Sequence, residues 1–328
     1  MSFEQFQDEL VKLQPILDKL VLLNNSVKDI IYSVTQQSPL NKRLYHYTSA
    51  QGLKGIIDSA SIWATDSRFL NDSSEIQDGI NALSKHLKKF KCLNLLSNHW
   101  EMVINQNQPH VISFCSEGDL LSQWRAYATE AEGYCIEFDT SDSNLASCRE
   151  ETVVIGDLVP VTYKENEKQK IISTIFATLT ETLAEFDIDI FKIETLPEVQ
   201  QGIITGLIFS AFTTPLASFK NSGFSEEKEW RVIINPNLPQ LNTLQHFRTF
   251  NNAFIPYIEA IFLQGNEEKL FQRELLPIKT ICLPPAAGKV SKLGLEMFLE
   301  ANGFNTKTGK IEVINSSIPL RNKKAMHW

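Results

Sequence analysis

Short strand-like segments and helical segments follow one another along this chain without the regular alternation of a parallel α/β fold. Residues 134–138 alternate between apolar and polar side chains, and residues 230–234 form a continuous apolar run, so both segments predict strands. Apolar residues recur at spacings of three and four over residues 1–35 and most of 168–219, which predicts helices. The irregular mixture predicts an α+β fold.

The same patterns divide the chain into an extension and one large domain. We expect a helical N-terminal extension over residues 1–42 and a single α+β domain over 43–328, with a helical insertion at about 168–219. Pro15 predicts a kink or the start of a second helical segment. The extension has more apolar residues than one helical hairpin can bury, so we expect it to pack on the domain or on another copy.

Composition excludes several classes of protein. The 328 residues carry a net charge of -8, so the molecule as a whole should not attract nucleic-acid phosphates. No apolar run is long enough for a membrane helix, and no export signal is visible, so we expect a cytoplasmic protein without a membrane partner. The five cysteines are scattered, which argues against a disulfide framework or a zinc site, and we expect no metal.

His46 is the first candidate for chemistry. It lies in a short aromatic strand between Tyr47 and Tyr45, directly before a helix that Ser49 is expected to cap. A histidine at a strand end can orient a ligand, because neighbouring loops meet there. A histidine that hydrogen-bonds to the backbone inside or at the edge of the sheet is the simpler interpretation.

Two further groups of side chains have both a structural and a functional interpretation. Ser113 and Ser116 lie at the end of a strand, where hydroxyl groups support a site residue or serve as ordinary turn residues. Trp124 and Tyr127 are three residues apart on an expected helix, so their rings share one face. Such a pair either belongs to the core or forms a wall against which a planar ring stacks.

The segment that enters the strand at residues 230–234 carries two close carboxylates. If strand alternation applies there, Glu227 and Glu229 point to one face, and Trp230 points to the other face. Repulsion between two such carboxylates raises the pKa of one of them, which suits an acid or base. Arg231 lies on the carboxylate side and can pair with either glutamate or hold a substrate phosphate. A solvated acidic turn is the simpler alternative.

Taken together, these motifs resemble a bacterial family described only as a domain of unknown function, number twenty-nine seventy-one. The resemblance runs from about Leu44 to Arg321. It is carried by His46, Tyr47 and Thr48; by Phe69, Leu70, Asn71, Asp72 and Glu75; by residues 113–116; by Trp124 and Tyr127; by residues 227–231; and by residues 317–321.

A more distant resemblance, to ADP-ribosyltransferase-like domains, implies a mixed or antiparallel sheet and NAD as the substrate. In such a domain, His46 would hold a ribose hydroxyl, and Tyr47 or Tyr127 would lie against the nicotinamide. Glu229 would stabilise the oxocarbenium ion as nicotinamide leaves, and Glu227 would activate the nucleophile. The other residues that the resemblance implies at the NAD site are Thr48, Ser113, Ser116, Trp124 and Arg231.

The acceptor of the ADP-ribose would be a macromolecule, either protein or nucleic acid, or water. A toxin or an antiviral effector is the setting that the resemblance suggests. Two other classes remain open from the sequence. One is a metal-dependent nuclease that uses Asp72, Glu75, Glu227 and Glu229, and the other is a non-catalytic sensor or interaction domain. In the latter, the N-terminal helices would bind a partner protein or a second copy.

Overall fold

A computed structural model gives the structure of the protein for residues 3–39, 43–70, 75–88, 108–127, 133–140, 143–149, 151–250, 252–264, 276–285, 287–306 and 311–319. Within these residues the fold is α+β with a mixed sheet, as the sequence predicts. Asp72 and Arg321, two residues of the motifs above, lie outside the described residues.

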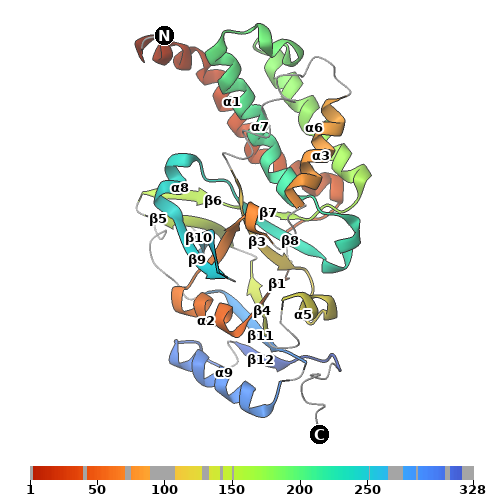
Figure 1. Cartoon of the computed structure of the whole chain (residues 1–328), viewed down its shortest axis with the longest axis vertical. Helices are drawn as coiled ribbons and strands as arrows, with labels where there is room; N and C mark the ends of the chain where they lie inside the picture. Colours follow the sequence, from red (N-terminus) through yellow and green to blue (C-terminus); the bar gives the residue numbers. More distant parts are fainter. Residues whose placement is uncertain are drawn as a thin grey trace.

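The sheet runs through the centre of the molecule (Figure 1). Its main order is β12-β11-β4-β1-β3-β2-β10-β5-β6, and β7, β8 and β9 pair beside this path. Neighbouring strands are antiparallel except for β11 and β12, which are parallel. The strands are β1 (Arg43–Thr48), β2 (Ile62–Asp66), β3 (His110–Cys115), β4 (Tyr134–Asp139), β5 (Ser143–Arg149), β6 (Thr152–Ile155), β7 (Asp157–Pro160), β8 (Glu229–Ile234), β9 (Gln245–Phe250), β10 (Ala253–Gln264), β11 (Ile278–Leu283) and β12 (Glu312–Asn315).

Four helices gather at one end of the sheet, and smaller helices cover its other parts (Figure 1). The gathered helices are α1 (Phe3–Thr35), α3 (Glu75–Leu87), α6 (Glu165–Ala184) and α7 (Glu198–Ser218). The others are α2 (Ala50–Ser59), α5 (Leu121–Tyr127), α8 (Leu238–Leu244) and α9 (Lys289–Ala301), with short 3-10 turns η1 (Ser67–Phe69), η3 (Ile190–Thr195) and η4 (Ser222–Glu227). None of the described helices is long and apolar enough to cross a membrane.

Helix α1 packs on the rest of the chain, in agreement with one of the two expectations for the extension. It is a single helix with Pro15 inside it, so no second helical segment begins there. Its residues Leu20, Val27 and Ile31 are fully buried in one apolar cluster with α3, α6 and α7. The extension and the helical insertion therefore share one core, which also reaches β7 and β8 through Val159 and Ile233.

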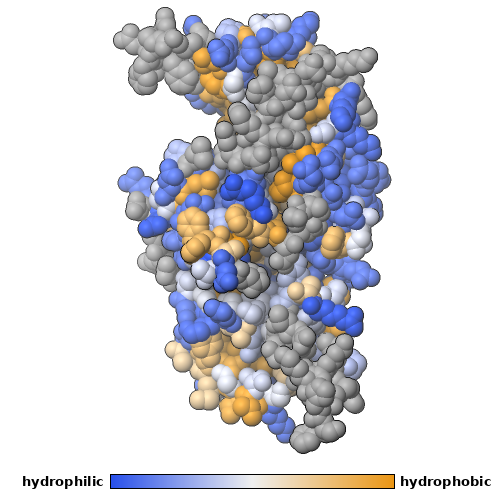
Figure 2. All heavy atoms as spheres, viewed as in Figure 1, coloured by the Kyte–Doolittle hydropathy of each residue, from blue (hydrophilic) through white to orange (hydrophobic). Residues whose placement is uncertain are grey.

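The apolar core of the sheet lies against α2 and α9, and it receives Trp230 from β8. The opposite side chains of β8 point toward the helical end, because Ile233 belongs to the cluster of α1, α6 and α7. The outer face of α9 is also apolar, with Val290, Leu293 and Met297 exposed (Figure 2). Strand β8 therefore separates an apolar face from a face on which charged residues can be buried.

Candidate functional site

The charged site forms where turn η4 becomes strand β8. Lys228, between the two glutamates, has a left-handed backbone with φ of 48°, a conformation that costs energy for a residue with a Cβ. Its carbonyl accepts hydrogen bonds from the Ser116 N–H at 3.0 Å and from the Ser116 hydroxyl at 3.2 Å. Glu227 is thus the last residue of the turn and does not lie in a strand. The expected strand alternation therefore does not determine the direction of its side chain. The turn nevertheless brings Glu227 and Glu229 to one cation.

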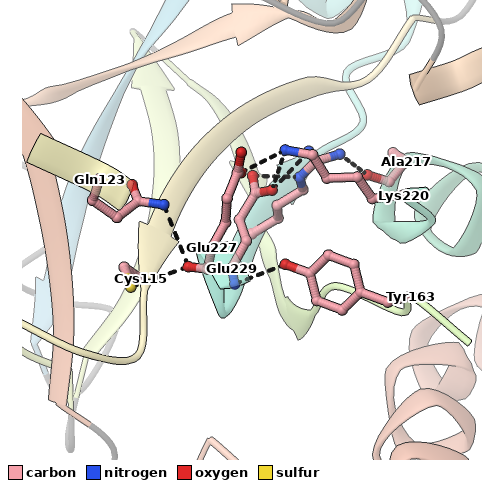
Figure 3. Close-up of polar contacts among 8 residues, drawn as sticks. Cys115, Gln123, Tyr163, Ala217, Lys220, Glu227 and Glu229 are labelled. Atoms are coloured by element: carbon pink, nitrogen blue, oxygen red, sulfur yellow. Dashed lines mark hydrogen bonds and ion pairs between the residues drawn. The ribbon is translucent and has the colours of Figure 1, made fainter. Parts of the chain in front are cut away.

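Glu229 and Arg231 form a buried pair with two hydrogen bonds (Figure 3 shows Glu229 and its partners). Arg231 Nε lies 2.7 Å from Glu229 Oε1, and Arg231 Nη2 lies 3.0 Å from Oε2. Arg231 Nη1 donates to the carbonyl of Ala217, near the end of α7, at 2.7 Å. The side chains of Glu229 and Arg231 are only 5% and 2% exposed. This pair joins β8 to α7 inside the protein.

Lys220 connects the two glutamates. Its Nζ lies 3.0 Å from Glu229 Oε2 and 2.7 Å from Glu227 Oε2, and its side chain is 3% exposed. The Glu227 side chain is 15% exposed, so it forms the outer end of this network. The Glu227 carbonyl accepts hydrogen bonds from Gln123 at 3.4 Å and from the Cys115 thiol at 3.1 Å. Helix α5 and strand β3 therefore hold the backbone of the more accessible glutamate.

The charges of the network decide the ionisation of Glu229. Burial acts to raise the pKa of Glu229, but Arg231 and Lys220 outweigh it, and a hydrogen bond from the Ser113 hydroxyl assists them. The result is a pKa lowered to about 2. For Glu229 the expected rise through repulsion between glutamates is therefore wrong, because two cations lie closer to its carboxylate than the sequence pattern indicated. Glu229 is a stable anion rather than an acid at neutral pH.

Tyr163 and Cys115 lie beside the charged residues, and neither adds a charge to them. Tyr163 accepts a hydrogen bond from the Glu229 N–H at 3.0 Å, and burial raises the pKa of its hydroxyl. Burial also raises the pKa of the Cys115 thiol to about 11, so the thiol is neutral and weakly nucleophilic.

His46 lies on strand β1 and contacts β3, the strand that also pairs with β8. Its Nδ1 donates a hydrogen bond to the Ser113 carbonyl at 3.0 Å, and its ring contacts Phe114 edge to face at 5.8 Å. Burial lowers the pKa of His46, so the ring is neutral at pH 7. Ser113 therefore contacts His46 through its carbonyl, and its hydroxyl helps to lower the pKa of Glu229. The backbone hydrogen bond agrees with the simpler interpretation of His46.

The aromatic residues predicted near a ligand pack mainly with one another. Trp124 is fully buried, contacts the Tyr47 ring edge to face at 5.1 Å, and donates its indole N–H to Asp119 at 2.9 Å. Tyr127 is partly buried against the same cluster. The expectation that Trp124 touches a bound ring is corrected, since no part of its side chain is exposed. The cluster instead supports Cys115, which belongs to it and contacts Glu227.

The remaining predicted residues fall into two groups. Ser113, Ser116 and Arg231 lie at the charged network. Thr48 lies away from it, with its side chain against Gly52 in the first turn of α2. Among the described residues, no group of three or more histidine, cysteine or acidic side chains is arranged to hold a metal ion.

Sequence reasoning did not identify Lys220, Tyr163 or Gln123. Lys220 follows a long helical segment and precedes a polar turn, so it resembles an ordinary surface lysine in the sequence. Lys220 reaches both glutamates only because β8 lies beside the end of α7. This is a tertiary contact, which the local sequence does not predict. A lysine seven residues before two close glutamates is the only local signal.

Comparison with known proteins gives one match. No curated protein and no solved structure matches the chain. The family model described as "Protein of unknown function (DUF2971)" matches residues 123–232. This segment includes Lys220 and the glutamates, whereas His46 and Ser113 precede it. The resemblance to this family is therefore confirmed over residues 123–232, about a third of the chain.

Proposed function

We propose that this protein cleaves the bond between nicotinamide and ribose in NAD and transfers the ADP-ribose to a macromolecule or to water. The observation that carries the proposal is the meeting at Ser113 of two residues that are far apart in the sequence. His46 of β1 bonds to the Ser113 carbonyl, and the Ser113 hydroxyl lies close enough to Glu229 of β8 to help lower the pKa of its carboxyl group. The ADP-ribosyltransferase-like resemblance implies this combination of a histidine, a serine and a glutamate.

The chemistry requires an anion beside the sugar. As the C–N glycosidic bond breaks, its electron pair leaves with nicotinamide, and positive charge develops on the ribose. A hydroxyl of the acceptor then forms the new bond to that carbon and gives its proton to a base. A fixed carboxylate favours both steps, because it stabilises the cation and can accept the proton.

Glu227 suits this role better than Glu229. Glu229 is only 5% exposed, and Arg231 and Lys220 already balance its charge. Glu227 is more exposed, and Lys220 fixes its carboxylate at 2.7 Å. We therefore assign Glu227 to the sugar and to the acceptor proton, and Glu229 to the placement of Lys220. This assignment gives Glu227 both of the roles that the resemblance divided between the two glutamates.

The fit to the rest of NAD depends on His46. Its Nδ1 is engaged by the backbone, so its Nε2 is the atom available to a ribose hydroxyl. Tyr47 lies beside the network, and its hydroxyl is already engaged with backbone groups at Glu117 and Leu120. Tyr127 is then the better candidate for contact with nicotinamide. Transfer by a toxin or an antiviral effector is the setting in which we place this activity.

The alternative of a metal-dependent nuclease fits this centre less well. A divalent cation needs oxygen ligands whose charge is not already neutralised. Here Lys220 contacts both Glu227 and Glu229, and Arg231 contacts both oxygens of Glu229. A metal ion would have to displace these buried cations.

The proposal is tested by the release of nicotinamide from NAD, with and without a chelator. We expect release by the full chain that is insensitive to the chelator. The Glu227→Gln variant should release nicotinamide roughly a hundredfold more slowly, since one electrostatic partner of the transition state is lost. The matched control is Glu226→Gln, because Glu226 is exposed and adjacent. Equal release by the two variants, or metal-dependent cleavage of nucleic acid in place of release, would refute the proposal.

A further inference from the structure

Strand β3 has an edge at which two different strands pair with its two ends. Strand β8 pairs with the whole of β3 on one edge. On the other edge, β1 pairs at Cys115, and β2 pairs at Val111 and His110. The strands β1 and β2 therefore separate along the middle of β3. The His46 ring enters this separation and bonds to the Ser113 carbonyl.

Arg248 reaches the same region from β9. Its Nη2 donates to the Thr65 hydroxyl at 3.0 Å, and its guanidinium lies 5.8 Å from the centre of the Trp63 ring. Its Nε is buried and has no hydrogen-bond partner. Within the described part of the chain, no carboxylate forms an ion pair with Arg248. An arginine that is half-buried without a counter-charge is unusual, because such groups are normally paired.

The surroundings of Arg248 contain a second basic group and a further donor. Arg248 is close enough to His46 that its charge adds to burial in lowering the pKa of that ring. The indole nitrogen of Trp63 is also buried without a partner. A guanidinium cation, a neutral imidazole and unsatisfied N–H groups thus gather where β1 and β2 separate. An anion that accepts hydrogen bonds is the ligand that suits these groups.

We propose that Arg248 and His46 form a binding subsite for a phosphate group. A phosphate oxygen can accept from the guanidinium and, once the phosphate charge has favoured protonation of the ring, from His46 Nε2, and the negative charge compensates the unpaired arginine. Thr65 holds the guanidinium from one side, and Trp63 lies beneath it. The protein supplies the hydrogen-bond donors of this subsite, and the phosphate supplies the acceptor.

The subsite deepens the proposed function, because NAD carries a diphosphate next to the ribose that we assign to His46. Only the identification of the ligand as NAD rests on that function. Binding of a phosphate group is argued instead from the unpaired guanidinium of Arg248 and the unsatisfied N–H groups beside it. The two parts can therefore fail separately.

Calorimetry on the full chain tests the subsite with inorganic pyrophosphate, ADP-ribose and nicotinamide as probes. We expect pyrophosphate and ADP-ribose to bind through Arg248. The affinity for nicotinamide alone should not depend on Arg248. Arg248→Gln should weaken the binding of both phosphate probes about tenfold or more, while Arg248→Lys should keep part of it. The matched control is Arg149→Gln, since Arg149 is an exposed arginine that contacts only the Thr243 carbonyl among the described residues.

A second measurement needs no variant. In NMR titrations of the wild-type chain, saturating pyrophosphate should raise the pKa of His46, because an anion beside the ring stabilises its charged form. An unchanged His46 titration, or equal affinities of wild type and Arg248→Gln for pyrophosphate, would overturn the subsite. Pyrophosphate binding that requires Arg248, in a protein that releases no nicotinamide, would uphold the subsite and refute the proposed function.

Discussion

Arg231 contacts both carboxylate oxygens of Glu229, at 2.7 Å and 3.0 Å, in a part of the protein that water does not reach. The two residues alternate on strand β8 and point to the same face, while Trp230 between them points into the apolar core. The start of β8 is therefore fixed on both faces. On one side the fixing interaction is hydrophobic, and on the other it is ionic.

Removal of Arg231 should destabilise the fold. Arg231→Met leaves the Glu229 carboxylate buried with Lys220 as its remaining cation, and loss of one member of a buried pair costs about 3–5 kcal/mol. Chemical denaturation gives the free energy of unfolding. The matched control is Arg43→Met, because Arg43 pairs with Glu137 at 3.4 Å but is 75% exposed, and we expect a change below about 1 kcal/mol there. Equal losses in the two variants would contradict a buried, energetically coupled pair.

Acid should weaken the protein through Glu229. The pKa of Glu229 is lowered in the fold, from 4.5 to about 2. A lowered pKa gives stability that is fully present above the unfolded value and is lost as pH falls from about 4.5 toward 2. The contribution is about 3 kcal/mol, since each pKa unit corresponds to about 1.4 kcal/mol. In Glu229→Gln, the free energy of unfolding should fall less steeply over this range of pH, and parallel curves would contradict the assignment.

Helix α1 should be part of the core rather than an appendage. Leu20 is fully buried among α6 and α7, whereas Leu22 is 67% exposed on the same helix. Leu20→Ala should lower the free energy of unfolding by about 2–5 kcal/mol through the cavity it leaves, and Leu22→Ala should change it little. Deletion of residues 1–37 should in turn reduce solubility, because the cluster that α1 covers becomes exposed. A truncated chain with unchanged melting and elution would show that α1 is dispensable.

Regular patterns made most of the fold predictable. The apolar run of β8, the Ser49 cap of α2 and the helical spacing of α1 each appear within a few residues of sequence, and each forms as expected. The sequence does not predict strand β5, because its serine, asparagine and arginine residues interrupt the apolar pattern typical of a strand. It is held by pairing with β10 and β6, and such pairing leaves no local signal.

The candidate site was predictable only in part, for a related reason. The residue types around Glu227 and Glu229 are visible in the sequence, but their ionisation depends on where the cations lie. Lys220 comes from the end of α7 and reaches both carboxylates only after β8 returns beside that helix. The sequence thus indicated repulsion between the glutamates, while the fold supplies attraction to two cations.

The turnover and the stability of two variants, measured side by side, test the central claim most directly. We expect Glu227→Gln to lose less stability than Glu229→Gln, because Glu227 is the more exposed of the two and Lys220 keeps Glu229 as a partner, and to lose roughly a hundredfold in nicotinamide release per folded molecule. Glu229→Gln should show the larger loss of stability, about 3 kcal/mol, because Arg231 and Lys220 keep their buried charges. If Glu229→Gln instead unfolds like wild type and abolishes release while Glu227→Gln releases nicotinamide normally, the roles assigned to the two glutamates are contradicted.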